Sequence, residues 1–337
     1  MDIIRIQKGF FQLIQQQNSD KNIADLVAQE LSIGKSGAYR RIRSETLLSF
    51  EELLILSKKF SISLDTLINP MATGFLAPVL SRNLNQVHDY LEEIESDLRQ
   101  ISQCRDSKLY FLSLEFFFYL FEPKLAAFKF YMWNRIVWQG NDKKIEPFDF
   151  DLYLKDKKFI HKIQSIEKLY RQIASEEVWK TDMLNTTLQQ IRHCVNSGLF
   201  KNFEDAIELF TVLKKLLKDL ELIAQKGVKQ GGETDNGASI QIWYNEIFET
   251  NNTILIDTKD RQLIYFLFDA PNFMISHNQN MYQHGMNYFK EICHFSFNII
   301  GTNEQFRHKC FSLLTKKVET YENDILRTQN TSQNLIF

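Results

Sequence analysis

The chain has 337 residues, which is more than one ordinary hydrophobic core supports and predicts two or three folding units. Hydrophobic residues make up 44% and charged residues 24%, a composition typical of soluble globular proteins. The formal net charge of −2 excludes a bulk attraction to nucleic acid, so any such affinity must come from the local placement of basic side chains.

The first 70 residues carry the pattern of five short helices. Apolar residues recur at helical spacing in 3–16, and further helices are expected over 22–31, 35–43, 50–60 and 64–68. Ser49 followed by Glu52 has the arrangement of a capping box at the start of the fourth helix. Asn69 and Pro70 end this unit, which we define as a first domain, 1–70.

Several features of this domain belong together. They are Ala28 in the second helix, the turn Leu31-Ser-Ile33, the helix Lys35–Arg43 and the trailing pattern Ser49-Phe-Glu-Glu-Leu to Asp65. Because of these features, the segment 3–68 resembles the λ-repressor-like, or Xre-type, helix-turn-helix family. The resemblance implies a bacterial DNA-binding regulator.

Two positions depart from the family pattern. Ser32 stands where the family usually has glycine, so we expect a non-glycine residue at positive φ, at a cost on the order of 1 kcal/mol. Arg41 stands where an apolar residue is common, and Ile42 is its replacement. The second departure predicts a slight rotation of the third helix.

The third helix has two faces of different chemistry. Ala38 and Ile42 lie four residues apart on one face, which can pack against the second helix. A major groove admits a helix of this width, and an arginine can bond both acceptors of a guanine edge. On the opposite face we predict contacts to bases from Lys35, Ser36, Tyr39 and Arg40. On the flanks of this face we predict contacts to phosphates from Arg41, Arg43 and Asn22. The alternative is a helical bundle whose arginine-rich face is only solvated.

Residues 71–104 form a connector with a heptad seam. Apolar residues follow at alternating spacings of four and three from Leu80 to Ile101. This seam predicts a dimerisation helix. A dimer would read two half-sites about 34 Å apart. The contact residues of this helix are Leu84, Val87, Leu91, Ile94 and Leu98. The alternative is an amphipathic helix packed on the rest of the chain, with dimerisation through another surface.

The remaining residues, 105–337, predict a mostly helical regulatory or oligomerisation domain. Helices are expected over 107–139, 159–177, 180–197, 203–226, 279–298 and 303–326. Three β-branched and aromatic runs near 240–268, separated by polar turns, predict a small antiparallel β-meander. The fold class is therefore mainly α, with a five-helix N-terminal unit and a larger helical domain.

Motifs that carry chemistry are missing from the sequence. It has no GxSxG, no phosphate-binding glycine-rich loop and no HExxH. The acidic pair Glu176-Glu177 is adjacent in an expected helix, so its carboxylates point apart. The histidines and cysteines of the last quarter form no HxxxH or CxxC pair. We therefore expect no catalytic, metal or cofactor site, and no enzyme.

The four cysteines are widely spread, which predicts reduced thiols in a cytoplasmic protein. The first residues lack the basic start and apolar run of a signal peptide. The most apolar region, 109–138, is interrupted by five charged residues, whereas a membrane span needs about 20 nearly uncharged ones. We expect no membrane partner.

These patterns predict a sequence-specific DNA-binding transcription regulator with a C-terminal sensing or protein-interaction domain. Its expected partners are double-stranded DNA, a second copy of the chain, and an unidentified protein or small-molecule effector. The alternative is a helical interaction or scaffold protein whose helix-turn-helix unit does not bind DNA.

Overall fold

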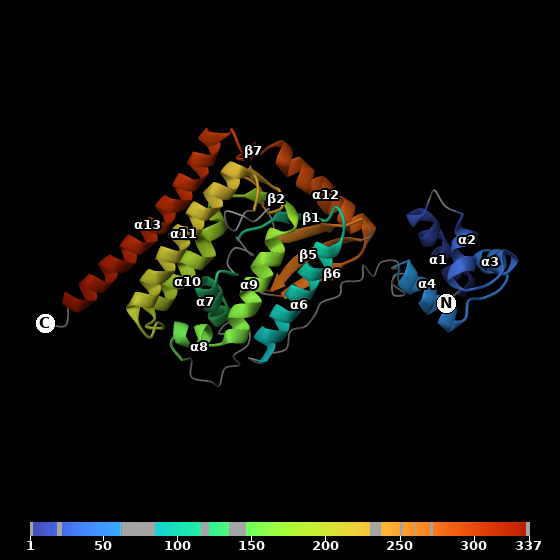
Figure 1. Cartoon of the computed structure of the whole chain (residues 1–337), viewed down its shortest axis with the longest axis horizontal. Coiled ribbons are helices and arrows are strands. Elements are labelled where there is room, and N and C mark those ends of the chain that lie inside the picture. The colour runs from blue at the N-terminus through green and yellow to red at the C-terminus, as the bar shows by residue number, and fades with distance from the viewer. Residues whose placement is uncertain are drawn as a thin grey trace. The chain divides into compact units, whose positions relative to one another are not determined.

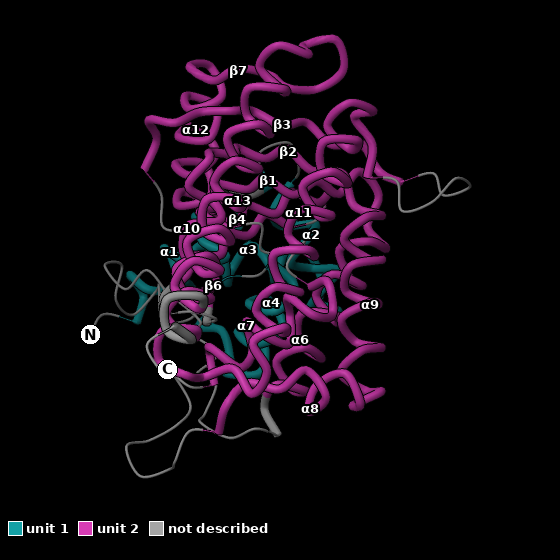
Figure 2. The backbone as a smooth tube through the Cα atoms, turned by 90° about the vertical axis from the view of Figure 1, so that its left-hand side faces the viewer, with its two compact units in different colours: residues 1–76, 276–278 teal, residues 77–275, 279–337 magenta. Residues whose placement is uncertain are grey.

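The chain divides into two compact units in a computed structural model (Figures 1 and 2). Unit 1 comprises residues 1–76 and 276–278, and unit 2 comprises 77–275 and 279–337. The structure describes residues 3–18, 22–60, 62, 85–115, 121–134, 146–229, 237–249, 252–259, 261–269 and 272–334.

Unit 1 is helical in its described part. It contains α1 (Ile3–Gln17), α2 (Ile23–Glu30), α3 (Lys35–Ile42) and α4 (Phe50–Lys59). Four of the five predicted helices are thus confirmed to within one residue at each end, and the fifth, 64–68, lies outside the described residues. The helices share one small core, made of Phe10, Phe11, Ile14, Ala24, Val27, Ala38, Leu56 and Ile62.

Helix α4 begins with the predicted capping box. The backbone N–H of Glu52 donates to Ser49 Oγ at 3.2 Å, and that of Ser49 donates to Glu52 Oε2 at 3.0 Å. The two residues thereby satisfy donors that a helix N-terminus otherwise leaves open. A cap of this kind stabilises a helix by about 0.5–2 kcal/mol.

Unit 2 contains a seven-stranded mixed sheet among its described residues, in the order β6-β5-β4-β1-β2-β3-β7. Three central strands run parallel, namely β1 (Lys108–Leu112), β2 (Ala174–Trp179) and β3 (Ile240–Tyr244). Strands β4 (Thr253–Asp257), β5 (Gln262–Asp269), β6 (Asn272–Ser276) and β7 (Phe297–Asn298) complete it. Antiparallel pairing joins β1 to β4, β4 to β5, and β3 to β7.

This sheet corrects the predicted antiparallel meander. The runs at β3, β4 and β5 are strands, but β3 and β4 are not neighbours because β1 and β2 lie between them. Strand β1 falls inside the helix predicted over 107–139, and β2 overlaps the end of the helix predicted over 159–177. Strand β1 is covered on both faces, so it has a nearly continuous apolar run in place of the alternation that marks a half-exposed strand.

Helical crossovers join the parallel strands. The segment from β1 to β2 contains α7 (Pro123–Trp133), α8 (Phe150–Leu154) and α9 (Lys157–Arg171). The segment from β2 to β3 contains the 3₁₀ helix η3 (Thr181–Leu184), α10 (Asn185–Asn196) and α11 (Phe203–Lys226). The bounds of α11 are those predicted. In contrast, the predicted helix 279–298 ends early, as α12 (Gln279–His294) followed by β7, and the predicted 303–326 is longer, as α13 (Glu304–Asn334).

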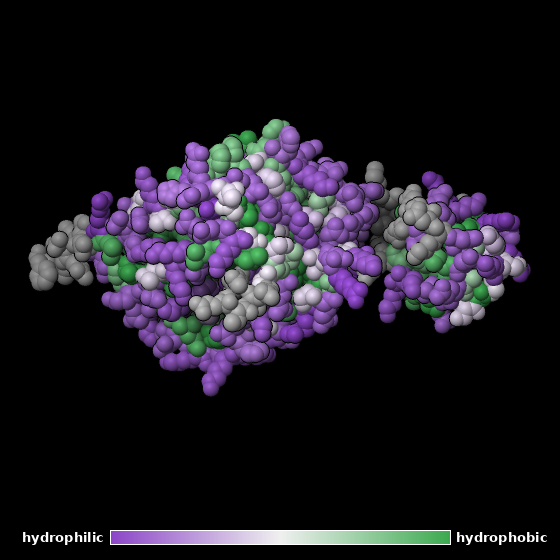
Figure 3. All heavy atoms as spheres, turned by 45° about the horizontal axis from the view of Figure 1, so that its top comes forward, coloured by the Kyte–Doolittle hydropathy of each residue, from purple (hydrophilic) through white to green (hydrophobic). Residues whose placement is uncertain are grey.

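Two apolar cores lie on opposite faces of the sheet. The larger core joins the sheet to α7, α9, α10, α11 and α13, while α12 covers the other face (Figure 1). Helix α12 approaches closely at Gly285, where an added Cβ would lie 2.8 Å from Ile264 Cδ1 and 3.0 Å from Leu255 Cδ2. The outer surface of unit 2 is largely polar, with apolar side chains gathered near its upper margin (Figure 3).

The heptad seam belongs to α6 (Asn85–Gln103), which packs on α9. Val87, Leu91 and Leu98 are buried in the larger core, and Ile94 packs against it. Leu84 lies outside the described residues. The structure thus corrects the assignment of this face as a dimerisation surface, because the chain's own core already covers it.

Candidate nucleic-acid interface

A tight turn places α3 after α2 in unit 1. Ser32 has a φ of 53°, as its position in the family pattern predicts. The backbone N–H of Ile33 donates to the carbonyl of Ala28 at 3.0 Å, which closes the turn at the end of α2. A serine tolerates this left-handed conformation at a modest cost. The turn fixes the direction in which α3 leaves α2.

Helix α3 is anchored through one face and open on the other. Ala38 is fully buried and Ile42 packs against the same small core. Tyr39 is 41% exposed, and Ser36 and Arg40 are also exposed. The predicted division of this helix into an anchoring face and an outward face is therefore present.

The outward arginines are solvated. Among the described residues, the side chain of Arg40 forms no ion pair and no hydrogen bond. The guanidinium of Arg43 lies 5.8 Å from the ring centroid of Tyr39, and its Nη1 is 3.9 Å from Glu45 Oε1, which is too long for a hydrogen bond. Both guanidinium groups thus keep donors that a phosphate or a base edge could accept.

Lys35 at the start of α3 is paired with α2. Its Nζ lies 2.7 Å from Asp25 Oδ1, and the hydrogen bond to this carboxylate raises the pKa of Lys35. Both side chains are well exposed, so water screens the pair and it adds little to stability. Lys35 can therefore exchange Asp25 for another anion.

Arg41 points away from the outward face. Its Nη2 donates to Glu52 Oε1 at 2.6 Å, its Nε donates to Oε2 at 3.0 Å, and its Nη1 donates to the carbonyl of Gly37 at 3.2 Å. The side chain is only 19% exposed. This pairing corrects the expectation that Arg41 contacts phosphate, because its guanidinium holds α3 against α4.

Asn22 is the N-cap of α2. Its Oδ1 accepts a hydrogen bond from the backbone N–H of Ala24 at 2.9 Å. The residue is exposed, and its Nδ2 donates to no described residue. Asn22 therefore remains available to an anion at this helix end, where the backbone dipoles favour negative charge.

Gln7 is a site residue that the sequence analysis missed. It is 6% exposed, and its Nε2 donates to the carbonyls of Arg41 at 2.7 Å and Thr46 at 2.9 Å. Its Oε1 accepts from the backbone N–H of Leu48 at 2.9 Å. One amide thus ties α1 to the end of α3 and to the segment before α4. The signal for it was a glutamine within the apolar stripe of 3–16.

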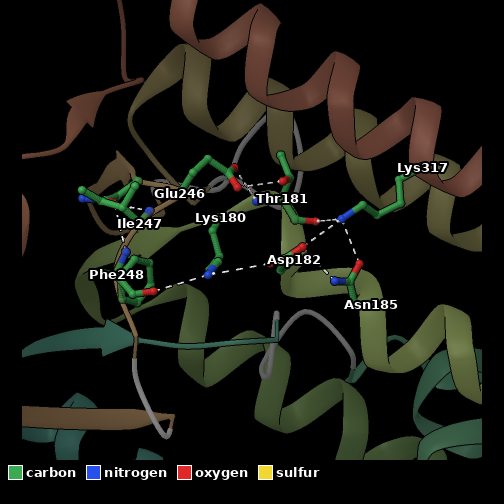
Figure 4. A network of polar contacts seen from close by, with 9 residues as sticks. Lys180, Thr181, Asp182, Asn185, Glu246, Ile247, Phe248 and Lys317 are labelled. Carbon is green, nitrogen blue, oxygen red and sulfur yellow. Dashed lines mark hydrogen bonds and ion pairs between the residues drawn. The ribbon is translucent and has the colours of Figure 1, made fainter.

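Unit 2 has a polar network at the carboxyl ends of β2 and β3 (Figure 4). Open α/β sheets often bind ligands at this edge. Here, however, the groups bond one another: Lys317 Nζ donates to the Thr181 carbonyl at 2.9 Å, to Asp182 Oδ1 at 3.1 Å and to Asn185 Oδ1 at 2.8 Å. The network anchors α13 to the start of α10.

Unit 2 also buries two ionisable side chains, Glu177 of β2 and Lys229 between α11 and β3. Glu177 accepts hydrogen bonds from the hydroxyls of Tyr170 and Ser175 and, at 2.9 Å, from Trp179 Nε1. Lys229 Nζ donates to the Ile173 carbonyl at 2.8 Å, and burial lowers the pKa of this lysine to about 7. Both residues are buried and bonded within unit 2, so they are closed to a ligand that arrives from solvent. The neighbours Glu176 and Glu177 do point apart, but across a strand and not around a helix.

A shallow hollow of about 360 Å³ lies between α11 and the start of α13. Its lining carries both signs of charge, including Lys218, Glu221 and Arg307. Arg307 donates from Nη1 to the Gly301 carbonyl at 2.5 Å, which braces the turn before α13. The effector expected from the sequence stays a prediction.

Within the described ranges, no three histidine, cysteine or acidic side chains are placed to hold a metal ion. None of the helices described combines the length and the apolar character needed to cross a bilayer. Comparisons with protein-family models, with curated proteins and with solved structures find nothing that matches this chain.

Proposed function

We propose that unit 1 binds double-stranded DNA through α3 and that the chain is a sequence-specific transcription regulator. One observation carries this proposal: α3 is fixed by the buried Ala38, while Tyr39 and Arg40 on its other face remain open to solvent. The resemblance of residues 3–68 to Xre-type helix-turn-helix proteins supports the same function.

In this proposal α3 enters the major groove. Arg40 bonds the two acceptors of a guanine edge, which contributes about 1–3 kcal/mol of discrimination against other bases. Ser36 lies about one turn before Arg40, and Tyr39 lies one residue before it. Both side chains contact DNA groups next to this guanine. Lys35, at the N-terminus of α3, leaves Asp25 for the DNA when the two anions compete.

Phosphate contacts come from the flanks of α3. Arg43 is the candidate at its C-terminal end, with a side chain that is 69% exposed. Asn22 and the backbone N–H groups at the start of α2 are the candidates on the other flank. Each neutralised phosphate releases counterions, so the affinity falls with salt.

Internal bonds hold this surface in place. The Arg41–Glu52 pair joins α3 to α4, and Gln7 joins α1 to the end of α3. A recognition helix held in this way loses little conformational freedom when it docks. We therefore assign these residues to positioning and not to contact.

Two substitutions test the proposal on a duplex that the full chain selects from a random library. Arg40→Ala should relax the preference among bases by up to the 1–3 kcal/mol of one bidentate contact. Arg43→Ala should weaken all duplexes alike and reduce the slope of log affinity against log salt by about 1. Lys58→Ala, an exposed cation on α4, is the control and should change neither. Unchanged binding in both α3 variants would contradict the proposal.

A second candidate is a protein-binding role for unit 1. Phe50 and Leu54 of α4 are 73% and 45% exposed, and Leu47 before this helix is 49% exposed. These apolar side chains favour contact with another protein. A unit used only in that way would leave Arg40 solvated, so Phe50→Ser would abolish partner binding while Arg40→Ala would have no effect.

A further inference from the structure

The end of the sheet at β7 exposes an apolar patch, which we define as Ile247, Phe295 and Phe297. Ile247 is 84% exposed and Phe295 is 73% exposed, more than any other large apolar side chain described in unit 2, and Phe297 is 51% exposed. The three come from the turn after β3, the turn after α12, and β7 itself. Apolar side chains gather at this margin of unit 2 in Figure 3.

A buried amide holds the two turns of the patch together. Asn245 is 5% exposed, and its Nδ2 donates to Ser296 Oγ at 3.0 Å and to the carbonyl of Phe295 at 3.4 Å. Its Oδ1 accepts from the backbone N–H of Ile247 at 2.8 Å. Both turns are therefore fixed before any partner arrives, which lowers the entropic cost of binding.

The surroundings of the patch suit a dry contact. Phe297 stacks on Phe306, with ring centroids 4.0 Å apart. The carboxylate of Glu246 accepts from the backbone N–H and the hydroxyl of Thr181, at 2.9 and 3.0 Å. Ile247 lies on the opposite side of this network from Lys317 (Figure 4). The carboxylate of Glu246, the residue before Ile247, is therefore already bonded within the unit.

We propose that this patch binds the same patch on a second copy of the chain. The choice of a second copy rests on the proposed DNA-binding function, since one recognition helix buries little surface and a two-fold dimer reads two half-sites. A two-fold interface uses one surface twice, so an apolar patch is its own complement. The heptad face of α6 is buried and cannot serve.

The size of the patch agrees with this role. Its three side chains expose on the order of 400 Å². A standard interface buries roughly 800 Å² on each partner, of which the apolar centre is only a part. The surrounding polar residues supply the rim.

Sedimentation equilibrium of the full chain tests the interface. The wild-type mass should rise with concentration from the monomer value of 39.9 kDa to twice that value. Ile247→Lys and Phe295→Lys should each remain monomeric, because a desolvated lysine would have to be buried twice. Leu152→Lys is the matched control and should dimerise as the wild type does, since Leu152 of α8 is 68% exposed outside the patch. Circular dichroism checks that each variant is folded.

A wild-type chain that stays monomeric, or an Ile247→Lys variant that still dimerises, would overturn the interface. Selection of DNA by the same samples separates this inference from the proposed function. If the chain is a monomer and still enriches a duplex sequence, this result contradicts the dimer interface and leaves the DNA-binding function standing. A dimer that needs Ile247 but enriches no sequence supports the patch and contradicts DNA binding.

Discussion

Arg41 and Glu52 form a two-point ion pair between α3 and α4, with Arg41 Nη2 2.6 Å from Glu52 Oε1. The same carboxylate also accepts the backbone N–H of Ser49 in the capping box. Glu52 therefore caps the N-terminus of α4 and also holds α3 in its orientation. The hydrogen bond from Arg41 lowers the pKa of Glu52, so the pair remains charged across the neutral range.

Replacing Glu52 should loosen α3 without touching its outward face. We expect Glu52→Gln to lower the free energy of unfolding of unit 1 by about 1–3 kcal/mol, because a charged hydrogen-bonded pair is broken. Hydrogen exchange of peptides covering residues 35–59 measures this change. Glu51→Gln, which alters an exposed neighbour, is the control and should leave exchange unaltered. Equal exchange in the two variants would show that the pair does not hold α3.

Gln7 offers a second test of how α3 is positioned. Gln7→Ala removes the partners of two carbonyls and one N–H, and each buried group left without a partner costs about 1–3 kcal/mol. We expect faster hydrogen exchange at residues 46–48 and weaker DNA binding with unchanged sequence preference. Gln12→Ala on the exposed side of α1 is the control. A shift in base preference would instead mean that Gln7 lies near the DNA.

The pairing of α6 with α9 predicts an acid-sensitive unit 2. Burial opposes ionisation of Glu95, but hydrogen bonds from Lys162, Ser165 and Arg99 outweigh it and lower the pKa of Glu95 to about 2. This pKa lies below that of the unfolded chain, so the stabilisation is present above about pH 4.5 and is lost as the pH falls towards 2.

Urea unfolding followed by tryptophan fluorescence measures this contribution. At pH 6 Glu95→Gln should unfold with about 3 kcal/mol less free energy than the wild type, and the difference should shrink as the pH falls to 3. Asp89→Asn on the exposed side of α6 is the control. A difference that stays constant with pH would contradict the role of the ionised carboxylate.

Lys229 predicts a further rise of stability with pH, in the alkaline range. Burial lowers the pKa of this lysine to about 7, so between pH 7 and about 10 the unfolded chain binds one proton more than the folded chain. The free energy of unfolding should therefore rise by up to about 1.4 kcal/mol per pH unit over this window.

Lys229→Met should remove that rise, because methionine does not titrate. The measurement compares urea unfolding of wild type and variant at pH 7.5 and pH 9.5, within the range that linkage predicts. Lys226→Met, at the exposed end of α11, serves as control. Parallel profiles for the wild type and Lys229→Met would show that Lys229 stays charged in the fold.

Unit 1 could be predicted well because its signals are local. The cap at Ser49 and the apolar face of Ala38 and Ile42 lie within single helices, where spacing alone determines the face. The partner of Arg41 was beyond this reasoning, since a spacing does not tell which side chain of another helix lies opposite. Gln7 was overlooked because its three partners belong to a distant segment.

Unit 2 was predicted less well because its sheet joins distant segments. Strand β1 pairs with β2 and with β4, which follow 66 and 149 residues later in the registers of Lys108 with Ala174 and Asp257. The predicted meander paired strands by their order in the sequence. A buried parallel strand with a continuous apolar run also resembles a buried helix until its neighbours are known.

Selection of duplexes from a random library by the full chain tests whether α3 reads DNA. We expect enrichment of one sequence, arranged as an inverted repeat with half-site centres about 34 Å apart. We also expect Arg40→Ala to lose this preference. A library that emerges unenriched at low salt, from folded protein, would contradict the assignment of α3 as a DNA-reading helix.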